Sequence, residues 1–142
     1  MLRLLIGAML IVHGFIVGAQ SSGSFSAGAG VPNPSWLSWW PTALGQSWLI
    51  SRFGLERSAV SWLAGLLWLA GGVLLVAAGL SVAGFLVPQA LWRTLAVAGA
   101  VASLFMLIIY LHPLFAIGML ADAAILVALL WAHWPQAALI GA

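Results

Sequence analysis

The longest uncharged stretch of the chain, Ser58–Trp92, limits the folds open to it more than any other feature. It places thirty-five consecutive residues between Arg57 and Arg93 without one charged side chain. About twenty apolar helical residues span the hydrocarbon core of a bilayer, so this stretch is too long for one crossing. Pro88 has no backbone N–H and disfavours helix at the preceding residue, which predicts a turn over residues 81–89. We therefore expect a helical hairpin in a membrane.

The chain has too few charged residues to form a water-facing surface. Of 142 residues, 65% are hydrophobic and 4% are charged, whereas a soluble domain carries about 25% charged residues. The net charge of +2 comes from too few groups to form a basic patch, which excludes nucleic acid as a partner. The chain has no cysteine, so disulfides, a thiol redox pair, a cysteine-held iron–sulfur cluster and covalently attached haem are excluded as well.

The pattern of apolar runs predicts an all-α fold, an integral membrane four-helix bundle in a single domain over residues 1–142. The expected helices cover approximately residues 3–20, 58–81, 90–111 and 114–133. Val17-Gly18-Ala19 would also suit a signal-peptide cleavage site, but we expect the first segment to be retained as a helix. Four crossings place both termini on one side. The arginines are nearly balanced between the two sides, and we expect a bacterial inner membrane with cytoplasmic termini.

Residues 21–57 are expected to form a tryptophan-rich loop on the membrane surface. Indole rings prefer the headgroup level, where the ring is apolar and the N–H stays wet. The simpler interpretation is an interfacial anchor or partner contact. The alternative is a lateral portal for a quinone, a lipid or another apolar ligand. The tryptophans concerned are Trp36, Trp39, Trp40 and Trp48.

Small residues recur at helical spacing and predict where the helices pack. Lipid tails are as apolar as leucine, so close approach at small residues is what holds such helices together. We interpret these positions as helix packing. They are Gly7, Gly14 and Gly18 in the first helix, Gly65, Gly72 and Gly79 in the second, and Gly118 in the fourth.

Two ionisable residues, His13 and Asp122, are expected at the same depth. Each lies nine residues from its expected boundary, roughly 13 Å into the core. Such residues turn towards protein and mark proton relays or ligand sites. The two could form a hydrogen-bonded pair, bind a quinone carbonyl together, or make separate structural bonds. Tyr110 is the third candidate for this ligand-binding or proton-relay site. We expect no catalytic residue and no metal site, because no nucleophile–base set or carboxylate pair is present.

The run Arg3–Gly14, which ends in a His-Gly pair, resembles the opening of DoxX-like membrane proteins, the DoxX/DoxD family. Gly71–Leu80 resembles their Gly-rich second helix, and Ile117-Gly118 with Asp122 resembles the last helix of some members. The family often has a Lys where this chain has Val17 and a Glu where it has Trp68. The resemblance implies a small four-helix subunit that accompanies redox partners; the related DoxD proteins belong to a thiosulfate:quinone oxidoreductase.

These observations favour an accessory or quinone-adjacent subunit of a membrane electron-transfer complex, which is not an enzyme as an isolated chain. We expect no intrinsic cofactor, a quinone or lipid at the bundle surface, and membrane lipids with either other membrane subunits or copies of itself as partners. One alternative is a proton-coupled transporter or channel that works as an oligomer, with Asp122 in its path. Another is a structural pigment- or lipid-binding subunit of a photosynthetic or respiratory complex.

Overall fold

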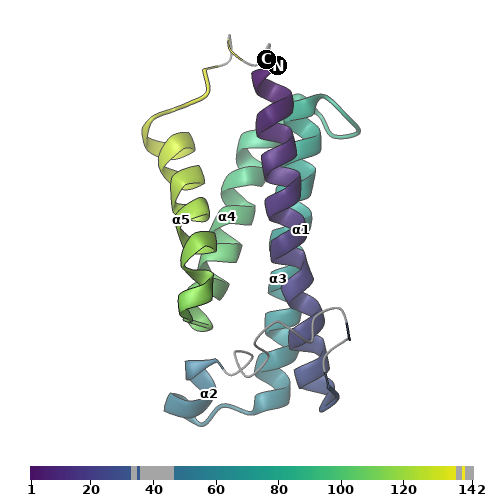
Figure 1. Ribbon diagram of the computed structural model, residues 1–142, viewed down its shortest axis with the longest axis vertical. Helices are drawn as coiled ribbons and strands as arrows, with labels where there is room; N and C mark the ends of the chain where they lie inside the picture. The colour runs from purple at the N-terminus through teal and green to yellow at the C-terminus, as the bar shows by residue number, and fades with distance from the viewer. Residues whose placement is uncertain (33–34, 36–46, 137–138, 140–142) are drawn as a thin grey trace.

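The computed structural model describes residues 1–32, 35, 47–136 and 139, and its described part is helical with turns and no strand. Four segments are long and apolar enough to cross a membrane: α1 (Leu2–Ala29), α3 (Arg57–Ala83), the segment Gln89–Ile109 and the segment Pro113–Trp131. The expected all-α four-helix membrane bundle is confirmed (Figure 1).

Short helical turns lead into the last two crossings. η3 (Gln89–Leu91) precedes α4 (Trp92–Ile109), and η4 (Pro113–Phe115) precedes α5 (Ala116–Leu126), which continues as the π-helical segment η5 (Val127–Trp131). The start of α1, the end of η5 and the α3–α4 turn lie at one end of the bundle, here called the terminal end (Figure 1). The opposite end, the loop end, carries the short helix α2 (Trp48–Phe53) and the start of α3.

α1 runs nine residues further than the sequence predicts, through the Ser- and Gly-rich segment that we assigned to the interfacial loop. One hydrogen bond within α1 and two contacts with α3 explain the difference. The Ser21 hydroxyl donates to the Gly18 carbonyl within the helix, and the ring of Phe25 packs over Gly65 of α3. Gly28 lies against Trp62. Packing against α3 therefore outweighs the weak helix propensity of Ser and Gly, and α1 ends only at Gly30, which is left-handed with φ 69°.

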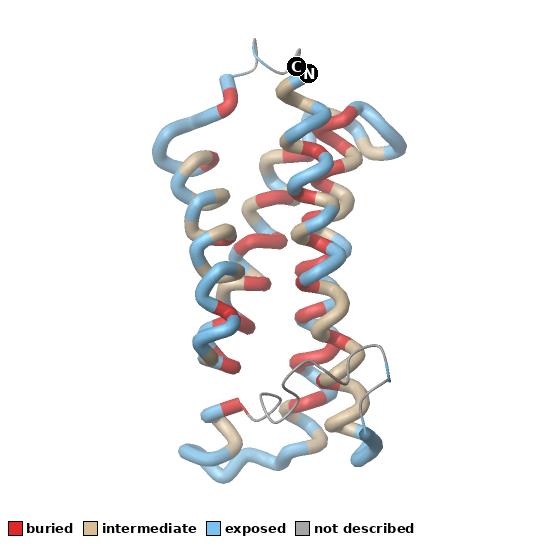
Figure 2. The backbone as a smooth tube through the Cα atoms, viewed as in Figure 1, coloured by how far each residue is buried: buried red, intermediate tan, exposed pale blue. Residues whose placement is uncertain are grey.

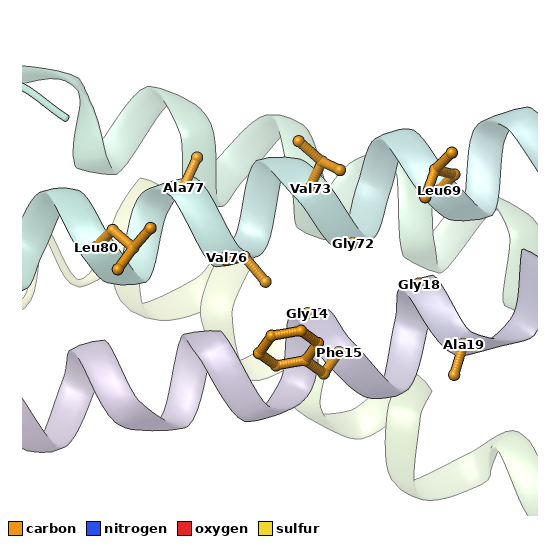
Figure 3. Close-up of a pocket in the computed structure, with 10 residues that line it drawn as sticks. All are labelled: Gly14, Phe15, Gly18, Ala19, Leu69, Gly72, Val73, Val76, Ala77 and Leu80. Atoms are coloured by element: carbon orange, nitrogen blue, oxygen red, sulfur yellow. The ribbon is translucent and has the colours of Figure 1, made fainter. Parts of the chain in front are cut away.

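Glycines let α1 and α3 approach until their backbones touch. A Cβ atom at Gly14 would lie 2.8 Å from the Gly72 carbonyl oxygen, and one at Gly79 would lie 2.6 Å from the Gly7 carbonyl oxygen. A Cβ at Gly72 would lie 2.6 Å from the Cα of Gly18. Figure 3 shows Gly14 and Gly18 facing Gly72 across this contact. The seam is thus specified by residues without side chains, as close packing in lipid requires.

The turns at each end of α3 are held by side chains. Glu56 caps the helix, with its two carboxylate oxygens accepting hydrogen bonds from the backbone N–H groups of Ser58 and Ala59 at 2.8 and 2.6 Å. At the terminal end the Ser81 hydroxyl donates to the Pro88 carbonyl at 2.7 Å, within the predicted turn over residues 81–89. Glu56, the one exposed acid of the chain, is therefore used at the loop end as a helix cap.

α5 is the least embedded crossing. α1 packs along α3, α3 along α4 and α4 along α5, whereas α5 touches α1 at few points. Only 17% of the α5 span is buried, against 50% of the α3 span. Figure 2 shows the buried positions concentrated on α3 and on the side of α4 that faces it. α5 therefore closes one side of the bundle loosely, and a cleft remains between α5 and α1.

Candidate functional site

His13 of α1 and Asp122 of α5 meet inside the bundle. The Nε2 atom of His13 lies 2.7 Å from Oδ1 of Asp122, and the carboxylate accepts the hydrogen bond. Asp122 is 0% exposed, and the His13 side chain keeps 16% of its surface accessible. Among the described residues, no other side chains bring an Arg or His nitrogen this close to a carboxylate. It bridges two crossings that otherwise touch at few points, so one polar bond joins α5 to α1.

The second carboxylate oxygen of Asp122 has no partner among the described residues, although it is buried. Burying a polar atom without a hydrogen bond costs about 1–3 kcal/mol, and more where the group is charged. One further donor would satisfy this oxygen. The carboxylate is thus arranged to hold the imidazole and to interact with one more polar group.

Ser103 of α4 is a candidate that the sequence analysis missed. The helices α4 and α5 run antiparallel, and Gly118 packs against Leu107. From this contact, one turn towards the terminal end leads to Ser103 on α4 and to Asp122 on α5, so these two residues lie at the same level. The Ser103 side chain is fully buried, and its hydroxyl has no partner among the described residues. Its sequence signal was a hydroxyl at the middle of the aliphatic third helix.

An apolar cleft between α1 and α5 leads to the pair from the terminal end. Its volume is about 390 Å³, within the range of small-molecule sites. His13 is the one ionisable side chain among its lining residues. The walls come from one face of α1, including Ile6 and Met9, and from one face of α5, including Ala121 and Ala124. Trp92 and Trp134 line it as well.

A second groove of about 480 Å³ lies beside the glycine seam of α1 and α3 (Figure 3). Its ten lining residues are all Gly, Ala, Val, Leu or Phe, with no polar side chain. It has no polar side chain that could orient a ligand head group. The α1–α5 cleft is the better candidate because it combines apolar walls with a polar end.

The structure does not bring Tyr110 to the pair, which corrects our grouping of the three residues. Tyr110 lies at the loop end of α4, with its ring 6.4 Å from that of Trp68. Burial raises the pKa of the Tyr110 phenol, and the nearby Ser24 hydroxyl lowers it by a smaller amount. Ser24 lies eleven residues from His13 on α1, about 16 Å along the axis. Tyr110 therefore belongs to an aromatic cluster with Trp68 and Phe115, away from the site.

The expected interfacial tryptophans can be placed in part. Trp48 begins α2, and its indole N–H donates to the Ile108 carbonyl at the end of α4, at 2.9 Å. Its ring is partly exposed. This bond satisfies one of the carbonyls that a helix leaves unpaired in its last turn, so Trp48 ties the loop to the bundle. Trp36, Trp39 and Trp40 lie outside the described residues.

The four apolar crossings define the class: this is a small multi-pass membrane protein built as a four-helix bundle. A scan against protein-family models finds no matching family, and comparisons with curated proteins and with solved structures find no match either. Val17 and Trp68, where DoxX-like proteins often carry Lys and Glu, are both buried among apolar side chains. The two positions therefore add no polar group to the interior.

Proposed function

We propose that this protein binds a lipid-soluble, quinone-type molecule in the α1–α5 cleft and serves as an accessory, quinone-adjacent subunit of a membrane redox complex. The observation that carries the proposal is the hydrogen-bonded pair of His13 and Asp122 at the end of an apolar cleft. A quinone has an apolar tail and a ring with polar oxygens. It matches a site whose walls are apolar and whose end offers an imidazole.

The pair also determines which atom of His13 could meet the ligand. Nε2 is held by the Asp122 carboxylate, which fixes the ring orientation and leaves Nδ1 as the other polar atom. A neutral imidazole held in this way can accept a hydrogen bond from a quinol hydroxyl at Nδ1, and an imidazolium held in the same way can donate one from Nδ1–H to a quinone carbonyl. The neighbouring carboxylate stabilises the imidazolium that forms if the proton is transferred. Electrons would pass to redox partners, in keeping with the resemblance to DoxX-like subunits.

Binding of decylubiquinone to the purified protein tests the ligand. Quinones quench tryptophan fluorescence, and Trp92 and Trp134 line the cleft. We expect saturable quenching that is weakened at least about tenfold by His13→Leu, because the head group then loses its hydrogen bond and faces an unpaired carboxylate. Ala124→Phe should weaken it as well by filling the cleft without altering the pair.

Ile117→Phe is the matched control, because Ile117 lies on the same helix, is 80% exposed and does not line the cleft. Equal quenching in the wild type, Ala124→Phe and Ile117→Phe would rule out the cleft as the binding site. Isolation in mild detergent followed by mass spectrometry tests the accessory role. We expect redox subunits to accompany the chain, and recovery of a homo-oligomer alone would contradict that role.

A second candidate is proton-coupled transport by an oligomer. The observation that favours it is the unpartnered, buried oxygen of Asp122 level with the unpartnered hydroxyl of Ser103. Intramembrane carboxylates of this kind occur in proton pathways. Liposomes that contain the protein and a pH-sensitive dye separate the two candidates. Proton flux that is lost in Asp122→Asn supports transport, whereas flux equal to that of empty liposomes supports the quinone-adjacent role.

A further inference from the structure

A groove on the other side of α5 combines basic side chains with apolar walls. It lies between α4 and the η5 segment at the terminal end and has a volume of about 510 Å³. Arg93, Thr94 and His133 provide its polar part. Val97 and Ala98 of α4 and Leu129 and Leu130 of η5 provide its apolar part, further along the helices. The polar part lies at the terminal end and the apolar part lies deeper in the bundle, which matches the order of head group and acyl chains in a phospholipid leaflet.

The Arg93 guanidinium is held in place at this groove. Its Nη2 donates to the His133 carbonyl at 3.3 Å and to the Pro135 carbonyl, and its charge lies 5.3 Å from the centre of the Trp92 ring. These bonds use one of the three guanidinium nitrogens. Nε and Nη1 make no hydrogen bond with the described residues, so Arg93 keeps donors for a further acceptor.

No acidic side chain competes for Arg93. The chain contains two acids in total. Glu56 caps α3 at the loop end, and Asp122 is buried and bonded to His13. Arg3, at the start of α1, adds a second cation to the terminal end, where its guanidinium lies beside Gly84. The two arginines at the terminal end therefore have no acidic side chain beside them to compensate their charge.

We propose that this groove binds an anionic phospholipid. The phosphodiester accepts hydrogen bonds from Arg93 and from the Thr94 hydroxyl, and an acyl chain lies along Val97, Ala98, Leu129 and Leu130. Arg93 stands at the start of the α4 crossing, the depth at which lipid phosphates lie. Basic pockets between transmembrane helices bind anionic headgroups, and one Arg near the membrane surface favours them about fivefold.

This site is separate from the α1–α5 cleft. Leu129 lines both spaces and stands between them. The lipid contacts no residue of the His13–Asp122 pair, so the inference does not depend on the quinone proposal. An anionic lipid here would fix the terminal ends of α4 and η5 to each other and thus set the width of the cleft on the other side of Leu129.

Native mass spectrometry tests the proposal with the full chain in detergent and equimolar dioleoyl-phosphatidylglycerol and dioleoyl-phosphatidylcholine. We expect the anionic lipid to be retained about fivefold more than the zwitterionic one. Arg93→Gln should bring the ratio close to one, whereas Arg52→Gln at the exposed loop end should leave it unchanged. Ala98→Phe should reduce retention of the lipid by filling the apolar part of the groove.

Arg93→Gln also removes the bonds to the His133 and Pro135 carbonyls, so Arg93→Lys serves as the second variant. Lysine keeps the charge without the planar fork, and we expect the preference for phosphatidylglycerol to persist in it while circular dichroism shows native helix content. Equal retention of both lipids by the wild type, or loss of the preference in Arg52→Gln, would overturn the proposal. So would loss of the preference on adding inorganic phosphate alone, since the site would then bind a free anion.

Discussion

Asp122 bonds to one polar side chain of the bundle interior and, among the described residues, has a free acceptor for another. One carboxylate oxygen accepts a hydrogen bond from His13, and the other is buried without a partner in the described structure. An Asp at the middle of a membrane helix costs about 2.5–3.5 kcal/mol on insertion scales, whereas a Leu is favourable by a few tenths. A hydrophobic residue at this position would insert more easily. The carboxylate therefore makes insertion less favourable. The proposed role of Asp122 in binding a quinone-type ligand would explain why the chain carries it.

Replacing Asp122 tests that role at the scale of a single residue. Asp122→Asn keeps an oxygen that can accept the His13 N–H, so we expect a thermal midpoint close to that of the wild type. The neutral amide no longer stabilises an imidazolium that donates to the quinone carbonyl, so quinone affinity should fall about fivefold, the equivalent of about 1 kcal/mol. Circular dichroism melting and fluorescence quenching provide the two measurements.

Asp122→Leu is the companion variant. We expect it to insert and melt at least as well as the wild type but to bind decylubiquinone no better than Asp122→Asn, because His13 is then unsupported. Unchanged quinone affinity in both variants would show that the pair is only a structural contact.

At the scale of the elements, the seam between α1 and α3 depends on which glycines meet backbone. Gly14 and Gly18 are one helical turn apart and form a GxxxG motif, yet their surroundings differ. A Cβ at Gly14 would lie 2.8 Å from the Gly72 oxygen and 2.8 Å from the Val76 nitrogen. A Cβ at Gly18 would come no closer than 3.8 Å, to the Cα of Gly72. Within the motif, Gly14 therefore has no room for a side chain, whereas Gly18 has room for a methyl group.

We expect Gly14→Ala to destabilise the bundle by about 1–3 kcal/mol, because backbone atoms cannot move aside as a flexible side chain can. Gly18→Ala should be nearly neutral, or slightly stabilising through its higher helix propensity. Thermal melting of the two variants in the same detergent checks the difference. The outcome that contradicts the packing is a Gly18→Ala variant that melts as low as Gly14→Ala.

At the scale of the whole molecule, the charges at the two ends differ. The terminal end carries Arg3 and Arg93 without an acidic side chain, whereas the loop end carries Arg52 and Arg57 together with Glu56. Each end has two arginines, and acidic side chains contribute little to the positive-inside rule, so cytoplasmic termini stay a prediction. In the folded protein, the groove between α4 and η5 and the α1–α5 cleft both reach the terminal end.

Single cysteines test the orientation cleanly, because the natural chain has none. Ser51 of α2 and Ala90 of the α3–α4 connection are both exposed and lie at opposite ends. In intact cells we expect a membrane-impermeant maleimide to label Ser51→Cys and to label Ala90→Cys only after permeabilisation. The opposite pattern would place the termini outside, and with them both proposed sites.

The sequence by itself determined that this is a four-crossing membrane protein, because lipid cannot hydrogen-bond the backbone and long apolar runs must then form helices. It also predicted the depth of His13 and Asp122 and the turn over residues 81–89. Only the tertiary structure decided that the two side chains meet, that Tyr110 lies elsewhere, and that α1 continues through Ser21–Ala29. The physical reason is that rotation about a helix axis and weak local propensities are settled by packing between helices, and one chain read in order does not contain those contacts.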